Sequence, residues 1–214
     1  VNAAINVEDI LIAAYGDAKY YEKNHALVKK EQTGWYSEEG SELYDLYDLD
    51  HAKQLLAESG YNGEEVVILT TRDKMDWYNM MVVVQRQLEH LGMNVKLEVV
   101  DSATLSERLD DENAWDLYSS AFAFRPMPNQ YLFLNPEWYG WTNSEEISTI
   151  SEKILYASSI EEAQQYKDEF HKAFWDYLPI IKPGDSTSIT SLRSDVEGFQ
   201  SISGPIVWNV YLDR

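Results

Sequence analysis

The chain is 214 residues long and 44% hydrophobic, so it can form one large domain around a buried core. Acidic residues number 37 against 17 basic ones, and the net charge of −20 disfavours nucleic acid and anionic membrane surfaces as partners. The absence of cysteine excludes disulfides, thiolate metal sites and cysteine nucleophiles. No apolar run approaches the roughly 18 residues of a membrane span, and no signal-peptide pattern opens the sequence. The sequence begins abruptly with a helix-like stretch, VNAAINVEDILIAAYG, so we expect a piece of a longer protein.

Two helices and a long connection are predicted in the first sixty residues. Asn6 caps the first helix and Gly16 ends it. Residues 17–47 lack periodicity and predict an irregular connection that packs on another part of the protein, which can lie outside this sequence. A second helix runs from its cap, Asp48, to Ser59. Its expected buried side consists of Ala52, Leu55 and Leu56, and Gly60 follows as the left-handed stop.

Strand and helix patterns then alternate with short connections. Strands are expected at Glu65–Thr71, Asn94–Val100 and Trp115–Phe124. Between them, helices are expected at Asp76–Leu91 and from a cap at Ser102 to Leu109. This order predicts the α/β class, with a mostly parallel central sheet flanked by helices and right-handed crossovers.

The last third is predicted to begin with two helices. Capping boxes at Thr142–Glu145 and Ser159–Glu162 open them. Short strands are expected at Leu178–Ile181 and Ser188–Leu192, and the chain from Gly198 is irregular with a strand-like end. The second helix carries one apolar stripe, made of Ala163, Tyr166, Phe170, Phe174 and Tyr177.

The stretch from Trp115 to Trp141 carries the candidate binding residues. An apolar aromatic run ends at Arg125, where a loop punctuated by prolines begins, and open α/β sheets bind ligands at such strand ends. Two alternatives stay open: the rings form core packing, and Arg125 pairs with a surface carboxylate. The candidate ligand-binding residues are Phe122, Phe124, Arg125, Met127, Asn129, Trp138 and Trp141.

The sequence offers no pattern for a metal site, a cofactor or catalysis. The spacing of Asp45, Asp48 and Asp50 suggests a calcium loop, but the required glycine and the distal glutamate are missing. Phosphate-binding glycine loops and a nucleophile elbow are absent. We therefore expect no cofactor, no metal and no enzyme. The histidines lack metal-binding spacing; they are His25, His51, His90 and His171.

Several segments resemble one protein family. Residues 47–61, YDLDHAKQLLAESGY, resemble the "YDpekAkqLLaeAGY" helix of extracytoplasmic solute-binding proteins that serve peptide-type ABC importers. Residues 87–95 are similar to that family's "qLkkiGikV" step, and residues 4–10 to its "AIDREAI" helix start. Together with LRSDVEGF at residues 192–199, the resemblance covers nearly the whole chain.

The resemblance implies a two-lobed clamp that closes on a solute and docks on ABC permease subunits. Residues 1–195 would form the C-terminal, type II periplasmic-binding-protein-like lobe, and residues 196–214 a tail returning toward an absent N-terminal lobe. The implied protein is a non-enzymatic monomer in the periplasm or on the cell surface as a lipoprotein. The alternatives are a sensing or protein-interaction lobe uncoupled from transport, and a fold-related enzyme domain.

One departure from the family pattern concerns the ligand. Peptide binders of the family carry a tryptophan and, three residues later, an aspartate that pairs with the peptide ammonium group. Here the matching positions are Phe122 and Arg125, and Met127 stands where an acidic residue precedes proline. We therefore expect an anionic solute, a modified peptide or an oligosaccharide in place of an ordinary peptide.

Overall fold

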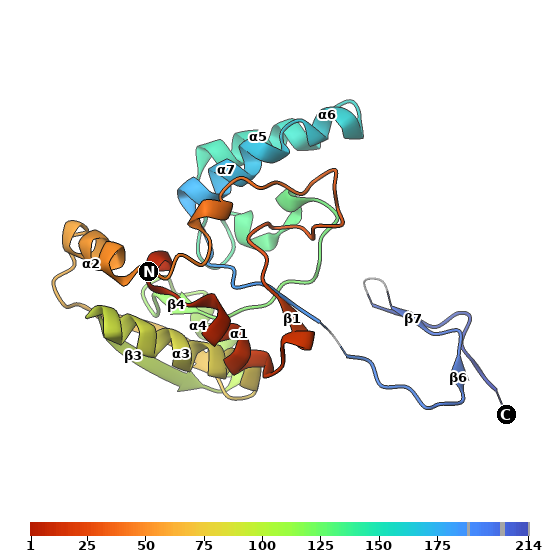
Figure 1. Ribbon diagram of the computed structural model, residues 1–214, viewed down its shortest axis with the longest axis horizontal. Helices are drawn as coiled ribbons and strands as arrows, with labels where there is room; N and C mark the ends of the chain where they lie inside the picture. Colours follow the sequence, from red (N-terminus) through yellow and green to blue (C-terminus); the bar gives the residue numbers. More distant parts are fainter. Residues whose placement is uncertain (188, 202–203, 214) are drawn as a thin grey trace.

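A three-stranded parallel sheet forms one half of the molecule (Figure 1). The computed structural model describes residues 1–187, 189–201 and 204–213. Strands β2 (Glu65–Thr71) and β3 (Asn94–Val100) have the predicted bounds, and the order is β3-β2-β4. The predicted parallel α/β architecture is thus confirmed.

Strand β4 is shorter than expected, because it comprises only Leu117–Tyr118 instead of Trp115–Phe124. Before it, Asp116 pairs with β2 twice: its N–H donates to the carbonyl of Val67 at 2.9 Å, and its carboxylate accepts from the Val67 N–H at 2.7 Å. Beyond Tyr118 the chain leaves the sheet, since Phe122 packs into a second core formed by helices.

Both faces of the sheet are covered by helices. Helices α1 (Val7–Tyr15) and α3 (Met75–Leu91) pack over Ile68, and α4 (Ser102–Leu109) packs over Leu69. Adjacent strand residues point to opposite faces, and both side chains are fully buried. Strand β2 is therefore the centre of this half.

The first two predicted helix starts are confirmed. The Asn6 side chain accepts from the N–H of Asp9 at 3.0 Å, and Asp48 accepts from the N–H of His51 at 3.0 Å at the start of α2 (Leu49–Glu58). One expectation for α2 is wrong, because Leu55 is 45% exposed and only Ala52 is fully buried there.

Two other caps differ from the prediction by one or two residues. Asp101, not Ser102, caps α4, because its carboxylate accepts from the N–H groups of Ala103 and Thr104, whereas a hydroxyl offers less charge. Ser144, not Thr142, caps α5 (Glu145–Leu155). The Thr142 hydroxyl is used elsewhere, as it donates to the carbonyl of Phe133 at 2.5 Å.

The other half is a second core, here called the helical core. The helix predicted from Ser159 is two helices, α6 (Ile160–Gln164) and α7 (Lys167–Tyr177), because the first ends at Gln165. Tyr177 lies outside the stripe and is 44% exposed. The buried members of the helical core are Leu27, Val28, Trp35, Phe133, Ile147, Ile150, Ile154, Ala163, Phe170, Ala173, Phe174 and Trp175.

The connection at residues 17–47 packs on this helical core, so its packing partner lies within the chain. It contains η2 (Ala18–Tyr20), β1 (Tyr21–Glu22) and η3 (Ser41–Leu43). Gly40 has φ +81°, and a Cβ there would lie 1.9 Å from the Trp175 ring, so only glycine fits.

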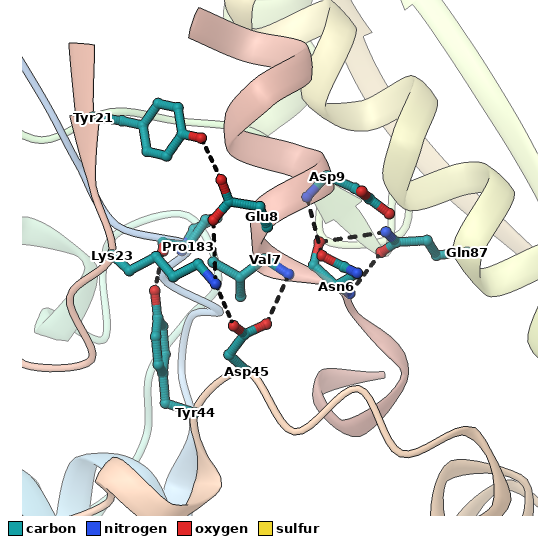
Figure 2. A network of polar contacts seen from close by, with 10 residues as sticks. All are labelled: Asn6, Val7, Glu8, Asp9, Tyr21, Lys23, Tyr44, Asp45, Gln87 and Pro183. Atoms are coloured by element: carbon teal, nitrogen blue, oxygen red, sulfur yellow. Dashed lines mark hydrogen bonds and ion pairs between the residues drawn. The ribbon is translucent and has the colours of Figure 1, made fainter. Parts of the chain in front are cut away.

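A polar network fastens the same connection to α1 (Figure 2). The Lys23 ammonium bridges Asp45 at 2.8 Å and Glu8 at 3.2 Å, and Asp45 also accepts from the N–H of Val7 at 3.0 Å. The Tyr21 hydroxyl donates to Glu8 at 2.5 Å, and this bond is the main reason that the Glu8 pKa lies below its usual value. Asp45 and Asp48 therefore each have a structural partner, in this network and at the start of α2.

The chain leaves the body through strand β5 (Asp185–Ser186), which pairs antiparallel with β1. The Lys182 ammonium donates to the Asn24 carbonyl at 3.0 Å and pairs with Asp185 at 2.9 Å. The strand predicted at Leu178–Ile181 is wrong, because Leu178 adopts φ +53° as the C-cap of α7. Of the strand predicted at 188–192, residue 188 lies outside the described residues, and residues 189–192 are not a strand.

The tail from residue 189 extends away from the body (Figure 1). Two short antiparallel pairs occur in it, β6 (Val196–Glu197) with β9 (Tyr211–Leu212), and β7 (Gln200–Ser201) with β8 (Pro205–Ile206). Trp208 is 78% exposed. The assignment of this tail to another lobe remains a prediction. Across the described residues, every helix is too short or too polar to cross a membrane.

Burial of His171 predicts a pH-dependent stability. Desolvation lowers its pKa to about 4, against 6.5 for the free side chain. As the pH falls, the unfolded state therefore binds a proton at this histidine before the folded state does. The stability that neutral His171 contributes is present above about pH 6.5 and is lost as the pH falls toward 4. We expect the unfolding free energy to fall by about 2 kcal/mol between pH 7 and pH 5 through this group.

Urea unfolding at both pH values checks this expectation. The His171→Gln variant should lack that component of the pH dependence, whereas His90→Gln, which changes an exposed histidine, should retain it. Equal pH dependence in wild type and His171→Gln would contradict the account.

Candidate functional site

The carboxyl ends of the three strands meet at one edge of the sheet. Strand β2 ends at Thr71, β3 at Val100 and β4 at Tyr118, and all run parallel. In open α/β sheets, ligands bind outside this edge. The chain that follows β4 is therefore the first place to look for a site.

Residues 120–124, here called the open segment, continue from β4 with an unpaired backbone. Within the described ranges, none of their N–H or C=O groups has a hydrogen-bond partner. Ser120, Ala121 and Ala123 are exposed, so this main chain is accessible. Unpaired main-chain groups next to a sheet can accept an extended ligand as an additional strand.

Three of the predicted site residues pack mainly on the helical core. Phe122, Met127 and Trp138 are partly buried against it. The Phe122 ring lies 5.2 Å from Phe133 and 6.2 Å from Tyr131, both in edge-on geometry. These side chains fix the path of the open segment.

Trp141 belongs to a different cluster, beside α4. Its ring stacks on Trp115 with centroids 5.6 Å apart, and Trp115 contacts Tyr118 at 4.8 Å. Trp141 has φ +45°, an uncommon value for a bulky residue, so the loop holds this ring in place against local preference. Trp141 thus packs on other rings than Phe122 and Met127, and Trp138 links the two groups through Tyr139, whose ring is 4.6 Å away.

Phe124 is the exposed member of the predicted residues, and Arg125 follows it on the loop. Phe124 is 41% exposed. Arg125 is half-buried, and it forms no ion pair with any carboxylate in the described ranges, so the surface-pair alternative is not realised. Its Nε is buried without a partner. Burial raises the pKa of the neighbouring Tyr131, and the Arg125 charge opposes that shift.

Two unpartnered buried polar atoms lie near the same edge. Thr70 and Ser119 have hydroxyl oxygens without a partner, although their side chains are 1% and 5% exposed. The register pairs Leu69 with Tyr118, so Thr70 and Ser119 come next on adjacent strands. Asn129 also has an unpartnered Oδ1, while its Nδ2 donates to the Ser151 carbonyl at 3.5 Å. Buried polar groups without partners are uncommon in folded proteins.

Sequence reasoning missed Gln32, which holds the loop from outside. Its Nε2 donates to the carbonyls of Arg125 at 3.3 Å and Pro126 at 3.0 Å. Its Oε1 accepts from the N–H of Lys29 at 2.8 Å. The sequence indicated only that residues 17–47 pack on another segment. No pattern in those residues identified Gln32.

A family profile matches residues 1–144, and its description is bacterial extracellular solute-binding proteins, family 5, middle part. The chain belongs to this family. The family assignment confirms the resemblance seen in the sequence motifs and places the open segment within the matched region.

Named relatives and solved structures agree with the family. A "probable peptide ABC transporter periplasmic-binding protein", y4tO of Sinorhizobium fredii, is 28% identical over 96% of this chain and 41% of its own length. The fold matches AppA of Bacillus subtilis, solved with a nonapeptide, with TM-score 0.82, 17% identity and coverage of 100% of this chain and 46% of that one. It also matches DppA of Helicobacter pylori, solved with the peptide STSA, with TM-score 0.80, 21% identity, and coverage of 100% and 43%. The chain thus spans less than half the length of these proteins.

Gln32 gives a prediction about the loop. Replacing it with alanine removes two bonds to carbonyl oxygens, each worth about 0.5–1.5 kcal/mol. We expect Gln32→Ala to lower the unfolding free energy by about 1–2 kcal/mol in urea denaturation. The control is Gln54→Ala, because Gln54 bonds only to Glu58 on the exposed side of α2. A Gln32→Ala effect no larger than the control effect would show that the tether is unimportant.

Proposed function

We propose that this chain is the ligand-contacting lobe of a two-lobed solute-binding protein that serves an ABC importer. The observation that carries the proposal is the open segment, an accessible and unpaired backbone at the carboxyl edge of a parallel sheet. Family membership supports the solute-binding class, and the relatives' greater length supports a second lobe. In this reading, the tail from residue 196 returns toward that lobe.

The solute would bind along the open segment and be covered by the second lobe. Main-chain N–H and C=O groups of residues 120–124 would pair with an extended or polar ligand, which is strand addition in the case of a peptide. The aromatic side chains Phe124 and Trp141 would provide apolar surface, and the Asn129 carboxamide a further acceptor. The remaining predicted residues, Phe122, Met127 and Trp138, would act chiefly by holding this path.

Arg125 argues against an ordinary peptide amino terminus at this place. Two like charges about 4 Å apart at an effective dielectric near 20 repel by roughly 4 kcal/mol. That energy corresponds to about a thousandfold in affinity. We therefore propose an anionic solute, a modified peptide or an oligosaccharide as the ligand class.

The wider context follows from the same proposal. We place the protein outside the cytoplasm, in the periplasm or on the cell surface as a lipoprotein, where it would act as a non-enzymatic monomer and deliver its solute to ABC permease subunits. A second candidate is a sensing or interaction lobe uncoupled from transport. The sequence flanking this chain distinguishes them, because a lipoprotein signal and an N-terminal lobe fit transport, whereas a kinase or DNA-binding segment fits sensing.

The clamp predicts that this chain alone binds poorly. Pockets normally bury about 70–90% of a ligand's surface, and one lobe supplies roughly half of the contact. We expect the solute that copurifies with the two-lobed protein, once identified by mass spectrometry, to bind the isolated chain more weakly than micromolar in calorimetry. Micromolar or tighter binding to the isolated chain would refute the need for a second lobe.

A further inference from the structure

Three large apolar side chains are exposed where α5 ends and α6 begins, in residues 155–162, here called the corner. Leu155 is 66% exposed, Tyr156 80% and Ile160 57%, although the adjacent Ile154 is buried in the helical core. Single exposed apolar residues are normal on a protein surface, whereas exposed apolar residues gathered in one place mark a surface that binds another molecule.

Hydrogen bonds hold the corner in one shape. The Tyr156 N–H donates to the Glu152 carbonyl at 2.9 Å, which closes the last turn of α5. The Ser159 hydroxyl accepts from the N–H of Glu162 at 3.2 Å, and the Glu162 carboxylate accepts from the N–H of Ser158 at 2.8 Å. These reciprocal bonds fix the start of α6. The exposed side chains are thus carried on an ordered backbone, which lowers the entropic cost of binding a partner.

The charges around the corner are mainly negative. Residues 145–169 contain seven acidic and two basic residues. Both basic residues are already engaged within the chain, since Lys153 pairs with Glu169 at 3.3 Å and Lys167 donates to the Tyr36 carbonyl at 2.8 Å. This surface therefore attracts cationic groups.

A shallow hollow on the same helix leads to the corner. It lies between α5 and α7, has a volume of about 480 Å³ and is lined by Glu145, Glu146, Thr149, Ile150, Lys153 and Glu169. Residues 145, 149, 153 and 156 follow one another at three- or four-residue spacing and share one face of the helix, so Tyr156 stands at the end of this hollow. The hollow has room for a long basic side chain, and the corner beside it offers apolar contact.

We propose that the corner and the hollow form a docking surface for a protein partner that is basic where it meets the hollow and apolar where it meets Tyr156. Charge decides among the occupants. A second copy of this chain and an anionic membrane are both repelled, because the net charge of the chain is −20. A protein surface with Lys or Arg side chains around an apolar recess is attracted by the glutamates and buries the three exposed side chains.

The docking surface is separate from the candidate solute site. In Figure 1, α5 and α6 lie at the end of the helical core that is remote from the sheet, whereas the open segment begins at the sheet, directly after β4. A partner on the corner therefore leaves the open segment accessible. The inference goes beyond solute binding and does not depend on the class of solute.

Photocrosslinking in cells that naturally make the two-lobed protein tests the docking surface. Tyr156→p-benzoylphenylalanine places a reactive ring at the most exposed of the three corner residues. Leu55→p-benzoylphenylalanine on α2 is the control, because Leu55 is also an exposed apolar residue. We expect position 156 to form an adduct with a different protein, and position 55 to form no adduct with that protein. Mass spectrometry should map the attachment to a segment in which Lys or Arg residues lie next to apolar ones.

Charge variants decide whether the glutamates recruit that partner. Glu146→Lys and Glu161→Lys change two different helices, and each should reduce the adduct by about tenfold, because repulsion replaces attraction. Glu107→Lys on α4 makes the same change at an exposed site outside the docking surface and should leave the yield unchanged.

Several results would overturn the docking surface while leaving solute binding in place. They are the absence of an adduct at position 156, attachment to a second copy, to a lipid or to the other lobe of the same protein, and attachment to a segment without basic residues. An adduct whose yield survives both Glu146→Lys and Glu161→Lys would overturn it as well.

Discussion

The packing of Phe122 on the helical core is the interaction on which the candidate site depends. Its ring contacts Phe133 and Tyr131, and this contact draws the chain away from β2 directly after Tyr118. The backbone that would have extended the sheet is thereby left unpaired and accessible. The aromatic contact in the helical core thus leaves N–H and C=O groups of the open segment free to form hydrogen bonds at the edge of the sheet.

The connection at residues 17–47 supports this arrangement from the outside. It is buried against the helical core through Leu27 and Val28, and it is fastened to α1 through Lys23 and Asp45. Because the connection is held at these points, the Gln32 side chain is positioned to donate hydrogen bonds to the carbonyls of Arg125 and Pro126. The exit of the chain is held in the same way, since Lys182 is largely buried and pairs with Asp185 beside β1. Desolvation lowers the Lys182 pKa, and Asp185 opposes this effect.

Elements governed by local pattern could be predicted from the sequence. The bounds of β2 and β3, and the caps at Asn6, Asp48 and Ser159, follow from alternation and from side chains within three residues. The cap predicted at Ser102 was wrong by one residue, because Asp101 precedes it. There the stronger acceptor is the cap.

Features that depend on distant residues could not be predicted. The aromatic run from Trp115 indicated a long strand, but its length is limited by Phe122 packing on helices that follow much later. The bond from Gln32 to Arg125 spans 93 positions and leaves no local pattern. Of the candidate site, the sequence could indicate the loop and Arg125, but not Gln32, Thr70 or Ser119, because only the folded chain brings them to it.

Hydrogen exchange of the backbone amides in residues 120–124 tests the central claim most directly. It should be measured by mass spectrometry on the two-lobed protein, with and without the solute that copurifies with it. The account predicts rapid exchange of these amides without solute and clear protection with it, because the ligand pairs with this backbone. Amides that still exchange rapidly while the solute is bound, or that are already protected without it, would contradict the claim that the open segment is the binding surface.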